Sequence, residues 1–169
     1  MRALALTNCE VHDNVPAEAF APTVEAARAG LVADVAAAIM ATPALARSAG
    51  LGDGYEHPEN LSEEDILTFL TPAFGTPERA RAFERLLVTS QTPDDLVAAE
   101  PGLRKLAVPT LLAWGTGDQF FDISWAHRLE DILPGPTTIV EVDGAKLFFP
   151  HERPGDLAPH LRRHWLTHG

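Results

Sequence analysis

The spacing of hydrophobic residues changes twice along this chain. Residues 2–8 are apolar at nearly every position, which is typical of a strand buried on both faces. From Pro22 the apolar residues recur at intervals of three and four, and this spacing predicts helices over roughly ninety residues. After Pro109 the chain alternates between strand and helix patterns. The second half therefore has the pattern of parallel βαβ units.

Three positions in the helical region mark the start of a helix. Ser62 and Asp65 have the spacing of a capping box ahead of an apolar run. Pro77 is placed as a first helical residue, because proline lacks the N–H that the first turn leaves unpaired. Pro93 opens a third, short helix. Residues 50–58, which precede these signals, are rich in turn-forming residues and predict a loop.

The segment from Val108 to Pro154 has the most specific pattern. A buried strand ends in Trp114-Gly115 and is followed by Asp118, and a second strand spans Thr137 to Val142. A carboxylate at the carboxyl end of a parallel strand lies where open α/β sheets place their sites. Asp118 is thus placed to orient and charge-stabilise a histidine. The alternative is that Asp118 only caps the turn that follows it.

This order of elements resembles the C-terminal part of the α/β-hydrolases, in the branch of haloalkane dehalogenases, epoxide hydrolases and related esterases. The residues that carry the resemblance are Gly117-Asp118 after a strand, and the last strand followed by Gly144-Ala145 and Glu152-Arg153-Pro154. The resemblance implies a partial α/β-hydrolase fold, with three parallel strands, flanking helices and an inserted helical cap. Residues 1–14 and 106–169 are then expected to form part of the core, and residues 15–105 the cap.

The resemblance also implies a chemistry. Intact relatives hydrolyse small hydrophobic esters, epoxides or halides through a covalent intermediate on a nucleophile, assisted by an acid and a histidine. Asp118 matches the acid position, whereas counting back from Pro154 puts Leu147 at the histidine position. The sequence also lacks the Gly-x-Ser-x-Gly or Gly-x-Asp-x-Gly elbow that holds the nucleophile. We therefore expect no hydrolase turnover from this chain alone.

Two histidines are candidates to replace the expected base. His151 lies four residues after Leu147, and His12 lies in the loop after the first strand, although most loop histidines are solvated and play no catalytic part. Because neighbouring side chains rarely face each other, we interpret His12 and Asp13 as a polar turn rather than a dyad. Three residues near strand ends are candidate substrate contacts: Asn8, Asp13 and Phe120.

No metal and no cofactor are expected. The seven histidines show no metal-ligand spacing with a third ligand nearby, and His160 and His164 are only two residues on one helical face. The histidines on predicted helices (His127, His160, His164 and His168) are expected to be exposed to solvent. Cys9 is the single cysteine, so no internal disulfide forms.

The composition of the chain excludes some classes of binding partner. The formal net charge is −11, and such an acidic surface repels nucleic acid and anionic membranes. Hydrophobic residues make up 46% and charged residues 22% of the chain, which argues against disorder. No apolar run approaches the roughly 20 residues of a membrane helix, and the N-terminus lacks the order of a signal peptide. We expect a cytoplasmic protein.

Two other functions stay open at this point. Strand 2–8 has lost the neighbour that precedes it in the resembling fold, and an open strand edge invites a partner strand, a homodimer or aggregation. The chain is then a non-catalytic interaction module. Alternatively, a separate polypeptide supplies the nucleophile, and this chain is one half of a complemented hydrolase acting on a small hydrophobic substrate. The expected lack of turnover is also explained if the chain is a fragment, a truncated gene product or a remnant of such an enzyme.

Overall fold

The computed structural model describes residues 1–48 and 50–169, and the chain divides into two compact units. We call them the strand unit, made of residues 1–17, 54–56 and 93–169, and the helical unit, made of residues 18–53 and 57–92. The assignment of residues 15–105 to a cap remains a prediction. Residues 54–56, from the middle of that range, belong to the strand unit.

The strand unit is built on a three-stranded parallel sheet in the order β1-β2-β3. The strands are β1 (Leu4–Thr7), β2 (Thr110–Gly115) and β3 (Thr137–Val142). Leu4 lies opposite Thr110, which in turn lies opposite Thr137. The expected α/β class with three parallel strands is confirmed, and the last strand has the bounds that its sequence pattern predicted.

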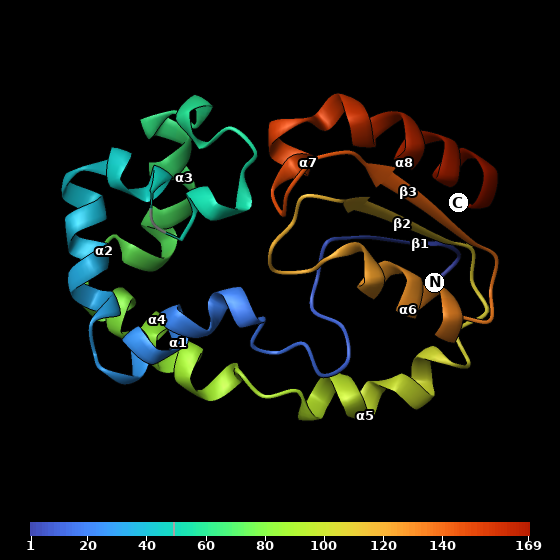
Figure 1. Ribbon diagram of the computed structural model, residues 1–169, viewed down its shortest axis with the longest axis horizontal. Coiled ribbons are helices and arrows are strands. Elements are labelled where there is room, and N and C mark those ends of the chain that lie inside the picture. The colour runs from blue at the N-terminus through green and yellow to red at the C-terminus, as the bar shows by residue number, and fades with distance from the viewer. Residues whose placement is uncertain (49) are drawn as a thin grey trace. The chain divides into compact units, whose positions relative to one another are not determined.

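Helices cover both faces of this sheet. The strand unit contains α5 (Asp94–Leu103), α6 (Ile123–Ile132), α7 (Phe149–Glu152) and α8 (Pro154–His168). Figure 1 shows α6 and α8 on opposite sides of the strands. Every residue of β2 is buried, because this strand pairs along both edges and has a helix on each face.

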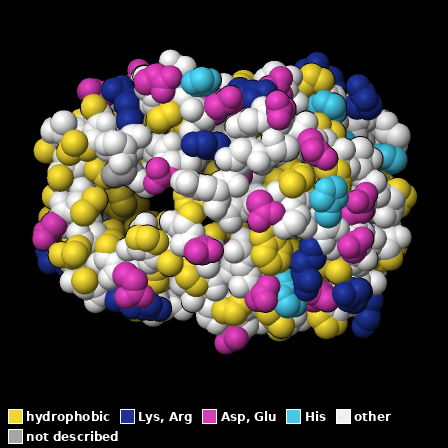
Figure 2. Space-filling view, viewed as in Figure 1, with side chains coloured by type: hydrophobic (Ala, Val, Ile, Leu, Met, Phe, Trp, Pro, Cys, Tyr) yellow, Lys and Arg dark blue, Asp and Glu magenta, His cyan; other side chains and the backbone are white. Residues whose placement is uncertain are grey.

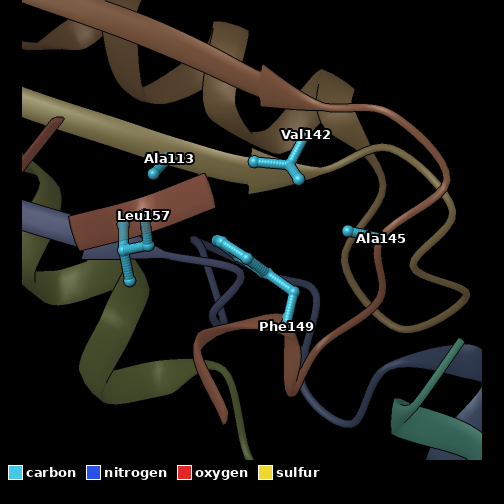
Figure 3. Close-up of a cluster of buried hydrophobic side chains, with 5 residues drawn as sticks. All are labelled: Ala113, Val142, Ala145, Phe149 and Leu157. Carbon is cyan, nitrogen blue, oxygen red and sulfur yellow. The ribbon is translucent and has the colours of Figure 1, made fainter. Parts of the chain in front are cut away.

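The core between the sheet and α8 is centred on Phe149. Its side chain is fully buried (0% exposed) against Ala113 of β2, Val142 of β3 and Leu157 of α8, as Figure 3 shows. Ala145, in the turn after β3, completes this cluster. Phe149 therefore belongs to the core of the strand unit.

Strand β1 differs from β2 in its exposure. All four of its residues are only half-buried, and within the described part of the chain no strand pairs with the edge that faces away from β2. Its outward backbone N–H and C=O groups thus form an open sheet edge.

The helical unit contains four α-helices in its described residues. They are α1 (Ala21–Arg28), α2 (Val32–Ala41), α3 (Glu63–Phe74) and α4 (Pro77–Ser90), with short 3₁₀ turns at Glu18–Phe20, Pro43–Arg47 and Pro58–Asn60 and another at Gly52–Gly54. The pattern that starts at Pro22 forms two helices instead of one. Gly30 has a φ of +73° and breaks the helix between α1 and α2.

Local signals at the other helix starts are confirmed. Ser62 and Asp65 form the reciprocal bonds of a capping box at the start of α3. Pro77 is the first residue of α4, whose N-terminus is capped by the Thr76 side chain. The unit has a core of its own around Ala27, Val32 and Leu87. No helix in the described residues combines the length and apolar character needed to cross a membrane.

Candidate functional site

The carboxyl ends of β2 and β3 meet in two closely packed turns. A Cβ atom on Gly115 would lie 2.3 Å from the carbonyl oxygen of Ala145, and one on Gly117 would lie 2.4 Å from that of Gly144. The Gly117 N–H donates to the Ala145 carbonyl oxygen at 3.0 Å. Glycine at both positions therefore allows the turn after β3 to lie directly against the turn that leads to Asp118.

Asp118 is buried at this edge of the sheet. Its residue is 5% exposed, and its Oδ1 accepts the backbone N–H of Phe120 at 2.8 Å. Its Oδ2 is also buried and accepts no hydrogen bond from any described residue. Asp118 therefore caps the turn through Oδ1, as the simpler interpretation predicted. Its Oδ2 accepts none of the hydrogen bonds of that cap.

Burial raises the pKa of Asp118 above its ordinary value. The nearby N–H groups of Phe120 and Phe121, the amide of Asn8 and the charge of Lys146 oppose this rise without cancelling it. Desolvation dominates because Oδ2 is buried from water and no described residue donates a hydrogen bond to it. A hydrogen-bond donor or a proton at Oδ2 would therefore stabilise the buried Asp118 side chain.

Asn8 connects the end of β1 to this site. Its Oδ1 accepts the Gly115 N–H at 2.7 Å, and its Nδ2 donates to the carbonyl oxygens of Gly115 and Phe121, each at 3.2 Å. The Trp114 indole donates to the same Phe121 oxygen at 2.7 Å. Asn8 is only 5% exposed, and its side chain forms these hydrogen bonds with the backbone of Gly115 and Phe121. A contact between Asn8 and substrate remains a prediction.

The other two candidate substrate contacts lie near the same edge. Phe120 is half-buried, and its carbonyl oxygen accepts a bond from Asn14 Nδ2 at 3.1 Å. Asp13 follows in the loop after β1 with its side chain 64% exposed. Their roles toward a substrate also remain predictions.

The interpretation of His12 and Asp13 was wrong in one respect. His12 Nδ1 lies 3.1 Å from Asp13 Oδ1, so these adjacent side chains do face each other. The cause is the left-handed backbone of His12, with a φ of +52°, which turns its side chain. On its other side, His12 Nε2 lies 3.2 Å from Glu100 Oε2, which also accepts a bond from Arg128. The hydrogen bond from His12 is the first cause that lowers the pKa of Asp13.

His151, the candidate substitute base, lies on α7 and is exposed. Its Nδ1 is 3.4 Å from the hydroxyl of Tyr55, a residue that is 2% exposed. Because Asp118 Oδ2 accepts no hydrogen bond from the described residues, the structure does not join His151 to that oxygen. Leu147, at the position where the resemblance places a histidine, is half-buried.

Solved structures match this arrangement over nearly the whole chain. The 2-hydroxy-6-oxo-6-phenylhexa-2,4-dienoate hydrolase of Rhodococcus sp. strain RHA1 is 19% identical with a TM-score of 0.66, and the match covers 97% of this chain and 55% of that one. The haloalkane dehalogenase DbeA of Bradyrhizobium elkani USDA94 is 18% identical with a TM-score of 0.66, covering 99% and 59%. The enol-lactonase of Burkholderia xenovorans LB400 is 19% identical with a TM-score of 0.63, covering 98% and 56%.

The chain has a partial α/β-hydrolase fold. It spans between 55% and 59% of the length of these three proteins. No protein-family model matches the sequence, and no curated protein matches it either. The structural likeness thus establishes the fold, and the chemistry has to be argued from the residues themselves.

Two further features do not involve the Asp118 turn: the histidines of α8 and a groove in the helical unit. In the described residues, no group of three or more metal-ligating side chains converges. The expectation that His164 is exposed was wrong: it is 9% exposed on α8, beside His168 with the ring centroids 5.2 Å apart. A groove of 720 Å³ lies in the helical unit, lined by Glu64, Leu67, Thr68, Thr71, Pro72 and Arg79. It contains none of the residues singled out from the sequence.

Sequence reasoning missed Gly54, Tyr55 and Glu56. These residues lie in a stretch that reads only as a turn-rich loop, and no local pattern indicates that they join the strand unit. The buried aromatic Tyr55 inside a polar loop was the one available signal.

Proposed function

We propose that this chain supplies the acid-bearing part of an α/β-hydrolase that cleaves a small hydrophobic ester, epoxide or halide, and that the chain by itself does not turn over. The observation that carries the proposal is Asp118, a buried carboxylate at the carboxyl end of β2 whose Oδ2 accepts no bond from the described residues. A buried acceptor left without a donor costs about 1–3 kcal/mol, so its retention favours a role in a completed site.

In this proposal the nucleophile, and the base unless His151 serves, come from outside residues 1–169. Leu147 carries no proton to transfer, and the sequence holds no nucleophile elbow. In the proposed enzyme, Asp118 accepts a hydrogen bond from the base and stabilises its charged form, as the acid of a triad does. The base and the nucleophile belong either to a longer chain that includes this sequence or to a separate polypeptide. His151 is the alternative base from within the chain.

The open edge of β1 is the place where we propose that the rest of the sheet joins. Its four half-buried residues and outward backbone groups suit a strand of the completing segment. Pairing there buries apolar surface of β1 and extends the sheet beside Asn8, which already connects β1 to the loop of Asp118. The completing strand thereby reaches the edge of the sheet that holds the carboxylate.

We propose that the helical unit serves as the cap over the substrate. Its apolar side chains support a hydrophobic ligand, since Leu31, Val35, Phe69 and Leu86 are between 46% and 55% exposed. Figure 2 shows hydrophobic side chains at the surface of this unit, on the left of the view. Exposed apolar side chains in such number commonly mark a binding surface.

A short-chain aryl ester tests the first part of the proposal. The purified chain is expected to release the phenol no faster than buffer does. Mixing it with a polypeptide that carries the preceding strands, a Gly-x-Ser-x-Gly elbow and a histidine base is expected to produce turnover that Asp118→Asn abolishes and exposed Asp131→Asn retains. Turnover by the chain alone, lost on Asp118→Asn, would show that it is a complete enzyme.

The second candidate is a non-catalytic module that pairs through β1, and the open edge is the observation that favours it. Size-exclusion chromatography separates the two. A dimer that resists dilution and dissociates when Ala5 is changed to proline supports the module. A monomer that associates only with the completing polypeptide supports the proposed hydrolase.

A further inference from the structure

The turn after β3 is held from two directions. On one side it lies against the turn of Gly115 to Gly117, as the close approaches at those glycines show. The N–H of Gly144 also donates to Thr116 Oγ1 at 3.0 Å on this side. The turn is also held by residues 54–56, which lie between two segments of the helical unit in sequence but belong to the strand unit. We call residues 54–56 the strap.

The backbone and aromatic contacts of the strap are specific. The N–H of Phe148 donates to the carbonyl oxygen of Gly54 at 2.8 Å. A Cβ atom on Gly54 would lie 2.5 Å from the Phe148 ring, so only glycine permits this approach. The buried Tyr55 ring lies between two partners, with its centroid 5.1 Å from that of Phe148 and 5.8 Å from that of His151.

Charged side chains bind Glu56, the last residue of the strap. The Glu56 N–H donates to Glu152 Oε2 at 2.9 Å, and Glu56 Oε2 accepts Arg153 Nη1 at 2.8 Å. The same Arg153 nitrogen donates to the carbonyl oxygen of Asp143 at 2.9 Å. Its hydrogen bonds to Asp156 and Glu56 raise the pKa of Arg153. One guanidinium thus joins the strap, the end of β3 and the start of α8.

We infer that the strap is a positioning element for the turn that contains Leu147 and for the His151 imidazole. Residue 147 is adjacent to Phe148, whose backbone and ring the strap holds, and His151 contacts Tyr55 directly. The strap therefore positions the turn after β3, which packs against the turn of Gly115 and Gly117 that leads to Asp118. The inference does not depend on the proposed hydrolase, because it concerns the conformation of the chain as it stands.

Backbone hydrogen exchange of the full chain tests the inference. Gly54→Ala pushes the Phe148 ring away, and we expect the Phe148 and Arg153 amides to exchange at least tenfold faster while the amides of β2 keep their rates. Gly102→Ala is the matched control, since a Cβ there meets no atom within 4 Å. Unchanged exchange at Phe148, or an equal rise throughout β2, would overturn the positioning role.

Two further variants, each with its own control, keep the test valid if Gly54→Ala fails to fold. Tyr55→Ala is expected to remove the ring-current shift on the His151 ring protons, and Tyr55→Phe is expected to keep it, because the edge-to-face ring contact persists. Glu56→Gln is expected to speed exchange at Arg153, whereas Glu59→Gln, an exposed residue paired with His57, leaves it unchanged. Identical His151 shifts in wild type and Tyr55→Ala would contradict the inference.

Discussion

The side chain of Asn8 binds both backbone polar groups of Gly115. Its Oδ1 accepts the Gly115 N–H and its Nδ2 donates to the Gly115 carbonyl oxygen, across 107 positions of sequence. This pair of side-chain bonds lies just beyond Thr7 and Ala113, the last register pair of β1 and β2. It also fixes the glycine from which the chain turns toward Asp118.

Asn8→Ala is therefore expected to destabilise the fold by about 1–3 kcal/mol, because it leaves buried backbone groups of Gly115 without partners. Urea unfolding followed by circular dichroism measures the loss. Asn60→Ala, at an exposed position, is the control and is expected to change stability by less than about 0.5 kcal/mol. Equal effects of the two substitutions would mean that the Asn8 bonds contribute nothing net.

Asp118 predicts a particular dependence of stability on pH. Burial raises its pKa in the folded chain above the ordinary value of 3.8, so the folded state binds this proton more tightly than the unfolded state does. The contribution of Asp118 to the free energy of unfolding therefore falls as pH rises above 3.8, and levels off above the folded pKa. Asp118→Asn lacks this fall.

Urea unfolding of wild type and Asp118→Asn between about pH 3.5 and pH 7 tests this sign. The variant is expected to gain stability relative to wild type as pH rises. Asp131→Asn, on the exposed face of α6, serves as the control. A wild type that gains relative to Asp118→Asn over this range would mean that the carboxylate is stabilised, not penalised, by its surroundings.

Leu147→His tests whether the turn after β3 still presents its side chain to the acid. If it does, the new imidazole donates to the unoccupied Oδ2 of Asp118, and its pKa rises above the ordinary value of about 6.5. Nuclear magnetic resonance titration of the new histidine measures this. The rise is expected to vanish in the double variant with Asp118→Asn. A rise that persists there would point to another partner.

Phe149→Ala is expected to cost about 3–5 kcal/mol, since it empties the centre of the cluster between the sheet and α8. Thermal and urea unfolding both report the loss. Phe69→Ala, at a residue 46% exposed in the helical unit, is the matched aromatic control and is expected to cost far less. Similar costs at the two positions would show that Phe149 is not the centre of the core.

Patterns with a local cause were predictable from the sequence. The capping box at Ser62 and the first-turn proline at Pro77 act within a few residues, so their spacing alone indicates the helix start. The apolar run of β2 was equally clear, because both of its faces are buried. The strand–helix alternation and the resemblance to α/β-hydrolases both predicted parallel strands, and the structure confirms three of them.

Features that depend on distant contacts were not predictable. The break between α1 and α2 lies at Gly30. The helical spacing of apolar residues continues through this glycine, so the spacing alone does not indicate the break, which accompanies the packing around Val32 and Leu87. The burial of His164 depends on where α8 packs. The position of the strap depends on the contact between Tyr55 and His151 of α7, which are 96 positions apart in the sequence. No local sequence pattern indicates such a contact. For the candidate site, the sequence located Asp118 but could not show that one of its oxygens accepts no bond from the described residues.

The separation between β1 and β2 also constrains how the protein is made. Asn8 and Gly115 lie 107 positions apart, and a ribosome adds about 5–20 residues per second, so β1 waits about 5–20 s for β2. The four α-helices of the helical unit form from local contacts during that interval. Until β2 arrives, the edge of β1 that pairs with Thr110 to Ala113 has no partner, and an unpaired strand edge of this kind favours aggregation.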